Sequence, residues 1–145
     1  MNPAISVAII TTAASIVLAA LSFIWTKRAE RKDILQKRKL SHYQELLSAI
    51  SDLAIDDMDK DEANLKFAKS VNTIALVAPQ DVINALMIYH DEIKYSNPNR
   101  TSQGHDYKLN LLLLSMRKSL ELSSKDNPKN FNFHLIGARP NKESK

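Results

Sequence analysis

The chain has 145 residues, no cysteine and only two glycines, and its formal net charge is +4. The lack of cysteine excludes a disulfide framework and a thiolate metal site, and so few glycines exclude a glycine-rich phosphate-binding loop. The charge is unevenly spread. Residues 27–39 hold seven bases and two acids, residues 40–124 eight bases and twelve acids, and residues 125–145 five bases and two acids. Because the middle of the chain is acidic, we expect no nucleic-acid partner.

The first long segment, Ala4–Trp25, is an uncharged stretch of 22 residues. About 20 apolar residues in a helix cross the hydrocarbon core of a bilayer. Its five polar side chains are hydroxyls that can bond back to helix carbonyls: Ser6, Thr11, Thr12, Ser15 and Ser22. A cleaved signal peptide is the alternative, but it begins with basic residues and has a shorter apolar region. We therefore predict a transmembrane anchor over residues 1–26.

A cluster of bases follows this segment and predicts its orientation. Lys27, Arg28, Arg31 and Lys32 lie immediately after it, and Lys37, Arg38 and Lys39 follow. Basic residues stay on the cytoplasmic side of a membrane, so we expect Met1 outside and the rest of the chain in the cytoplasm. The first four bases are also predicted to contact anionic lipid headgroups.

Small side chains recur along one face of the predicted span. Their spacing alternates between four and three residues, which places them on one helix seam: Ala8, Thr12, Ser15, Ala19 and Ser22. Small residues allow helix backbones to approach each other closely in a membrane. The seam predicts a homo-oligomer or a partner helix, and a pore built from several such helices is a narrower alternative.

The rest of the chain predicts helices over residues 27–55, 61–77, 79–95 and 105–122, from apolar stripes and from breaks at Pro79 and in the 96–104 loop. The expected inward residues are Leu40, Tyr43, Leu47, Ile50 and Ala54, widened by Leu46 and Leu53; then Leu65, Ala68, Val71, Ile74 and Ala75; then Val82, Leu86, Tyr89 and Ile93. The last helix is apolar nearly all round, so we expect it to be central or partly covered by another chain.

The predicted fold is therefore all-α. A transmembrane helix continues into a cytoplasmic bundle of about four helices over residues 27–122. Residues 123–145 are expected to form an irregular C-terminal flap and a tail.

Two short patterns suggest chemistry. His90-Asp91 and His105-Asp106 each have the letters of a metal phosphohydrolase pair, but that chemistry needs several ligands converging on a metal. We expect Asp106 instead to supply favourable charge at a helix start. The acidic turn at 56–62 imitates the first half of a calcium loop, but it lacks the required glycine and the final glutamate. We predict no catalytic residue, no cofactor and no metal, and a metal-dependent hydrolase is a minor alternative.

Four segments together resemble a family of proteins: residues 43–47, 72–83, 90–93 and 116–120. The pattern resembles uncharacterised small bacterial membrane proteins, of prophage or mobile-element type, that carry one N-terminal span and a cytoplasmic helical domain. The resemblance covers most of residues 40–120. It implies a bacterial inner-membrane location and identifies no catalytic residue.

These observations predict a non-enzymatic, single-pass membrane protein. Its cytoplasmic helical domain is expected to bind a protein partner, to self-associate, or both. The alternative is a membrane-active oligomeric effector in phage exclusion or defence.

Overall fold

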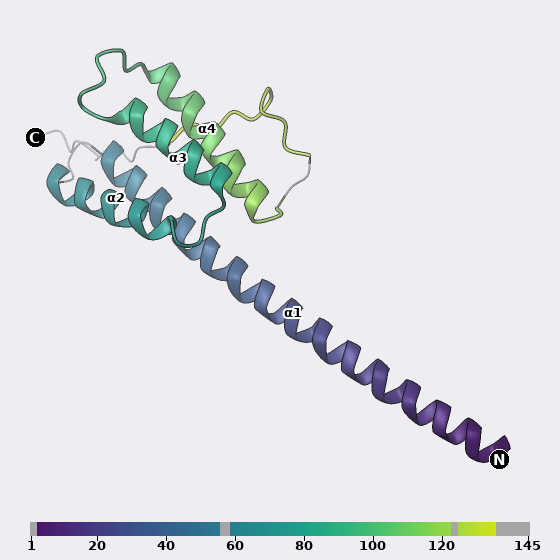
Figure 1. The fold of residues 1–145 in the computed structure, drawn as a ribbon. Coiled ribbons are helices and arrows are strands. Elements are labelled where there is room, and N and C mark those ends of the chain that lie inside the picture. The colour runs from purple at the N-terminus through teal and green to yellow at the C-terminus, as the bar shows by residue number, and fades with distance from the viewer. Residues whose placement is uncertain (1–2, 56–58, 123–124, 136–145) are drawn as a thin grey trace, which may run out of the picture. The chain divides into compact units, whose positions relative to one another are not determined.

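The structure, a computed structural model, describes residues 3–55, 59–122 and 125–135, without the side chains of Ser6 and Ala8. The described residues contain helices and no strand, which confirms the all-α prediction. The helices are α1 (Pro3–Ala54), α2 (Lys60–Ile74), α3 (Gln80–Ile93) and α4 (Ser102–Ser119) (Figure 1). The chain divides into two compact units, Met1–Lys37 and Arg38–Lys145.

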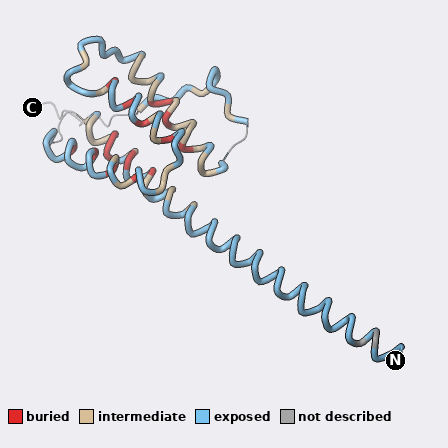
Figure 2. The backbone as a smooth tube through the Cα atoms, in the orientation of Figure 1, coloured by how far each residue is buried: buried red, intermediate tan, exposed pale blue. Residues whose placement is uncertain are grey.

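The first unit is the N-terminal part of α1. Every described side chain from Pro3 to Leu35 is exposed (Figure 2). By length and composition, α1 is the one helix among the described residues that is apolar enough to cross a membrane. The hydroxyls of Thr11, Ser15 and Thr26 donate to the carbonyls of Val7, Thr11 and Ser22, four residues back, at 3.0, 2.8 and 2.9 Å. These bonds confirm the predicted bonding back to the helix for Thr11 and Ser15.

The second unit has a continuous apolar core. Its side chains come from α2, α3, α4 and the C-terminal end of α1: Tyr43, Leu46, Ala49, Ile50, Phe67, Ile74, Val82, Leu86, Tyr89, Leu109, Leu112 and Met116. Helices α3 and α4 lie side by side (Figure 1). Lys66 of α2 binds Asp52 and Ser48 of α1, at 2.5 and 3.0 Å, which joins α2 to the end of α1.

Local hydrogen bonds explain where the shorter helices begin and end. Asp59 Oδ1 accepts from the backbone N–H groups of Asp61 and Glu62, so it caps α2. Thr101 Oγ1 accepts from Gly104 N at 2.9 Å and caps α4. Beyond α4, Leu122 N donates to Arg117 O and Glu121 N to Lys118 O, at 3.1 Å each. This is a Schellman closure with Glu121 in the left-handed region, at φ 58°.

The inward stripe predicted for α2 is confirmed only in part: Ile74 is buried and Val71 packs against the core, but the other three positions are exposed. Leu65 and Ala68 are exposed, and the buried residues are Ala63, Phe67, Ser70 and Ile74. On α1, Leu40 and Ala54 are exposed, and the buried set is Tyr43, Leu46, Ala49 and Ile50. In both helices apolar residues occupy more than one face, so periodicity alone leaves the choice of face to tertiary packing. The α3 prediction is confirmed for Val82, Leu86 and Tyr89.

The helix boundaries differ from the predicted ones by one to three residues. Helix α4 begins at Ser102 instead of 105 because Thr101 supplies its cap, and it ends at Ser119. Beyond it, the described residues 125–135 form neither helix nor strand. The rest of the predicted flap and tail, residues 123–124 and 136–145, lies outside the described part of the chain.

Candidate functional site

The His105-Asp106 pair belongs to a polar network around the start of α4. His105 Nε2 is 2.9 Å from the Tyr89 hydroxyl, and His105 Nδ1 is 3.2 Å from Asp106 Oδ1. His134 Nδ1 is 2.7 Å from Asp106 Oδ2. The Asp106 carboxylate therefore joins α4 to the 125–135 segment. Our prediction that Asp106 serves as charge at a helix start is wrong, because α4 begins one turn earlier, at Ser102.

Hydrogen-bonding chemistry assigns the protons in this network. A carboxylate only accepts, so His105 Nδ1 donates to Asp106, and His105 Nε2 forms the second hydrogen bond with the Tyr89 hydroxyl. Burial, with a smaller contribution from the Asp106 charge, raises the pKa of Tyr89. Hydrogen bonds from His105 and then His134 lower the pKa of Asp106. Tyr89 is 1 % exposed and its raised pKa keeps the phenol neutral, so it contributes to the network as a hydrogen-bonding group.

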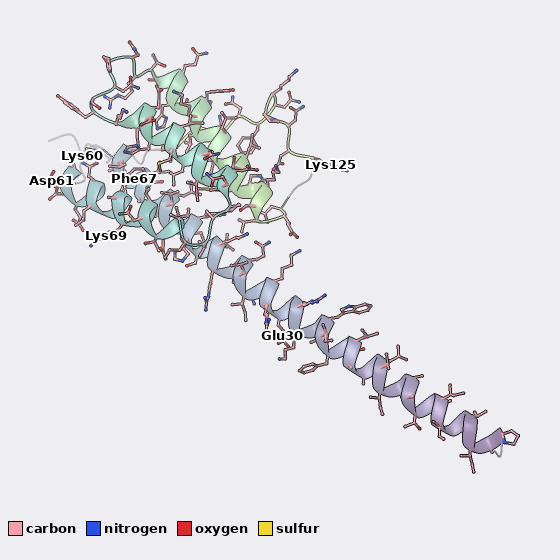
Figure 3. The ribbon with its side chains drawn as sticks, in the orientation of Figure 1. Glu30, Lys60, Asp61, Phe67, Lys69 and Lys125 are labelled. Carbon is pink, nitrogen blue, oxygen red and sulfur yellow. The ribbon has the colours of Figure 1, made fainter. Side chains whose placement is uncertain are left out.

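The second pair, His90-Asp91, lies on α3 away from this network. The His90 ring stacks on Phe67 of α2, with centroids 6.3 Å apart and planes 9° apart; Phe67 is labelled in Figure 3. His90 lies in the last turn of α3. Within residues 3–55, 59–122 and 125–135, no group of three or more His, Cys, Asp or Glu is placed to hold a metal ion.

Glu92 is the charged residue that the sequence analysis missed. Its side chain is 6 % exposed, and its carboxylate forms an ion pair with Lys108 of α4. Glu92 Oε1 also accepts from Thr101 N at 3.2 Å, and its backbone carbonyl accepts from Asn97 Nδ2 at 3.1 Å. The hydrogen bond from Lys108, then that from Thr101 N, lowers the pKa of Glu92. One side chain thus ties the end of α3, the loop after it and the start of α4.

Two grooves lie on the second unit. The larger, about 810 Å³, runs between α3 and α4, with Ala85, Ile88, Leu111 and Leu114 among its apolar residues and with Asp81 and Lys118 at its edge, 3.5 Å apart. The smaller, about 360 Å³, is almost wholly apolar. Its walls are the end of α1, α4 and the 131–135 segment. Both have the size of sites that take a side-chain cluster or a small ligand.

Comparison with protein-family models, with curated proteins and with solved structures finds no match. The resemblance to small bacterial membrane proteins therefore stays a prediction.

The residues predicted to form the association seam and the headgroup contact all fall in the first unit. Thr12, Ser15, Ala19 and Ser22 are exposed side chains of α1, and the side chain of Ala8 lies outside the described ones. Lys27, Arg28, Arg31 and Lys32 are exposed as well. Lys27 lies 2.7 Å from Glu30 Oε2 and 5.9 Å from the centre of the Phe23 ring. Glu30 is labelled in Figure 3.

The second unit limits how far the seam can extend along α1. Continued at the same spacing, the seam passes through Leu40, Tyr43, Leu47 and Ile50. Tyr43 and Ile50 are 2 % and 1 % exposed because they lie in the domain core. They cannot also face another chain, so an association seam on this face cannot continue beyond about Leu40.

Proposed function

We propose that this protein is a single-pass inner-membrane protein with a non-enzymatic cytoplasmic domain that binds a protein partner, self-associates, or does both. The observation that carries the proposal is the order of two features along α1. An uncharged apolar stretch with all described side chains exposed is followed at once by four exposed bases. Exposed apolar surface of this extent needs a covering, and lipid supplies it.

The orientation rests on the same bases. Lys27, Arg28, Arg31 and Lys32 lie within one turn or two of the apolar stretch, where cytoplasmic anionic headgroups would attract them by about 1 kcal/mol each. The proposed topology has the N-terminus outside and residues 38–145 in the cytoplasm.

The absence of cysteine makes a labelling test clean. Pro3→Cys and Leu76→Cys are introduced separately, the second at a side chain that is 84 % exposed. A membrane-impermeant maleimide should label Pro3→Cys in intact spheroplasts and Leu76→Cys only in inverted vesicles. The opposite pattern would overturn the orientation, and release of the protein by carbonate washing would overturn the anchor.

The partner-binding part of the proposal is supported by the groove between α3 and α4. Ile88 is half exposed, and Leu111 and Leu114 beside it are only partly buried, although all three are large apolar side chains. Crosslinking and mass spectrometry of the full chain in its native membrane tests this. Crosslinks from Lys118 to another protein, or to a second copy, are expected; crosslinks within single chains only would contradict the proposal.

A second candidate is a membrane-active oligomeric effector, as in phage exclusion or defence. The small residues Thr12, Ser15, Ala19 and Ser22 favour it, because they permit close helix packing in a membrane. Overexpression should then arrest growth and admit an impermeant dye, and Ser15→Leu with Ala19→Leu should abolish both effects. An unchanged membrane potential on overexpression would exclude this candidate.

A further inference from the structure

The 125–135 segment is attached to α4 by side-chain contacts spread along the helix. Arg117 Nε donates to Asp126 Oδ2 at 2.7 Å, and the Arg117 guanidinium lies 5.8 Å from the centre of the Phe131 ring. Further along, Phe133 N donates to Asn110 Oδ1 at 3.0 Å and His134 meets Asp106. The contacts on α4 move from residue 117 back to 106 as the segment advances. The segment therefore runs antiparallel to α4.

Alternate residues of this segment line the smaller groove. Phe131, Phe133 and Leu135 face Leu40, Tyr43 and Leu47 of α1 and Leu113, Met116 and Leu120 of α4 across a cavity of about 360 Å³. The segment leaves the groove partly open, because Phe133 is 41 % exposed, Leu40 44 % and Leu122 60 %. Of the backbone N–H groups from 131 to 135, that of Phe133 is the one seen bonded to a helix side chain.

The connection from α4 to this segment begins with a strained residue. Glu121 has φ 58°, a left-handed conformation that costs a residue with a Cβ more than it costs glycine. Opening the connection at Glu121 would release that strain. Nine residues, from Leu122 to Asn130, would then span up to about 30 Å when extended. Short connections under strain favour exchange of a segment between identical chains.

We propose that two copies of the chain exchange this segment, so that Phe131, Phe133 and Leu135 of each copy lie in the α1–α4 groove of the other. Exchange preserves the contacts that residues 131–135 make with the groove, whereas the Arg117–Asp126 ion pair lies within the connection that opens. A shared membrane raises the effective concentration of the second copy. The arrangement is two-fold symmetric and closes after two chains. The inference rests on the self-association part of the proposed function and names the surface that carries it.

The test uses two full-length copies with different tags, co-expressed in one membrane. One carries Leu113→Cys in the groove and the other Phe133→Cys in the segment, positions that line the same cavity. Neither substitution replaces a side chain that forms a polar contact between the segment and α4. A short bismaleimide should join the two tags in a heterodimer. Phe133→Cys paired with Leu76→Cys, which lies outside the groove, should give at least tenfold less heterodimer.

Two further variants separate the possible outcomes. Leu113→Cys with Phe133→Cys in one chain shows whether the segment occupies any groove. Crosslinks within single chains there, with no heterodimer in the mixed membrane, would overturn exchange, as would no crosslink at all. Ala19→Cys reports association of the spans independently. If Ala19→Cys forms a dimer but the groove heterodimer is absent, the exchange is overturned and self-association stands. If neither dimer forms, self-association is overturned as well.

Relief of strain supplies a second measurement. Glu121→Gly removes the left-handed penalty from the unexchanged chain, so it should lower the heterodimer yield several-fold relative to Glu121→Ala. Equal yields from these two variants would show that strain at Glu121 does not drive exchange and would overturn that step.

Discussion

The carboxylate of Glu92 and the ammonium of Lys108 form an ion pair between α3 and α4 with the Glu92 side chain 6 % exposed. Such a pair holds a fold in register, and loss of one partner leaves the other without its counter-charge. The Lys108 hydrogen bond, followed by that from Thr101 N, keeps the pKa of Glu92 below its ordinary value of 4.5. The contact therefore makes stability depend on pH.

The first prediction concerns acid. Because the folded-state pKa of Glu92 is lowered, its stabilising contribution is present above about pH 4.5 and is lost as the pH falls through the folded-state value. In thermal unfolding of the full chain in detergent, followed by circular dichroism, the wild type should lose Tm as the pH falls below the ordinary glutamate pKa of 4.5. Glu92→Gln should start lower at pH 7 and fall less. Glu92→Gln should still lose some Tm in acid, because the pKa of Asp106 is also lowered.

Glu45→Gln is the matched control for this experiment, because the Glu45 side chain is 56 % exposed. It should follow the wild-type pH profile. Parallel pH profiles for Glu92→Gln and the wild type would contradict the role assigned to Glu92.

The second prediction concerns Gly104, in the first turn of α4. A Cβ at this position would lie 2.6 Å from Glu92 Oε1 and 2.9 Å from Thr101 Oγ1. Alanine favours a helix over glycine by about 0.5–1 kcal/mol, but here it must displace the paired carboxylate. Gly104→Ala should therefore lower Tm. In a Glu92→Ala background the clash with the carboxylate is gone and only the contact with Thr101 Oγ1 remains, so the same change should lower Tm by less; an equal loss in both backgrounds would refute the contact with Glu92.

The third prediction contrasts two leucines. Leu112 is fully buried in the core, and Leu65, which the sequence pattern placed inward, is 55 % exposed. Leu112→Ala should destabilise the domain by about 2–5 kcal/mol in chemical denaturation, because it leaves a cavity. Leu65→Ala should change stability by about 0.5 kcal/mol or less. Equal losses of stability from the two substitutions would show that the Leu65 side chain is buried in the core.

The contrast also shows what could be predicted from the sequence. On α3, Val82, Leu86 and Tyr89 form a single stripe, so the periodicity identified the buried face. On α2, Phe67, Val71 and Ile74 share the face that meets the core, while Leu65 lies on another face, and the neighbouring helices decide which face is buried. The ends of α4 depended on caps at Thr101 and Glu121, the second without the usual glycine.

The polar contacts were harder to predict because they join distant parts of the chain. Asp106 meets His134 across 28 residues, and Asn110 meets Phe133 across 23, and neither pairing leaves a local pattern. Glu92 did leave a signal, since it lies three residues after Tyr89 and therefore on the buried stripe of α3. A charged residue on such a stripe predicts a buried partner.

The fourth prediction concerns the end of α4. Leu122 N and Glu121 N close the helix onto Arg117 O and Lys118 O, which requires φ 58° at Glu121. Glycine adopts this conformation without the Cβ penalty, while alanine keeps the penalty and, like glycine, lacks the carboxylate. Glu121→Gly should therefore be more stable than Glu121→Ala by about 1 kcal/mol in denaturant unfolding, after the added freedom of glycine in the unfolded chain is offset. Asparagine, which tolerates the left-handed region, should fall between them. A Glu121→Gly variant no more stable than Glu121→Ala would show that the closure is unstrained, and would remove the strain that favours exchange of the 125–135 segment.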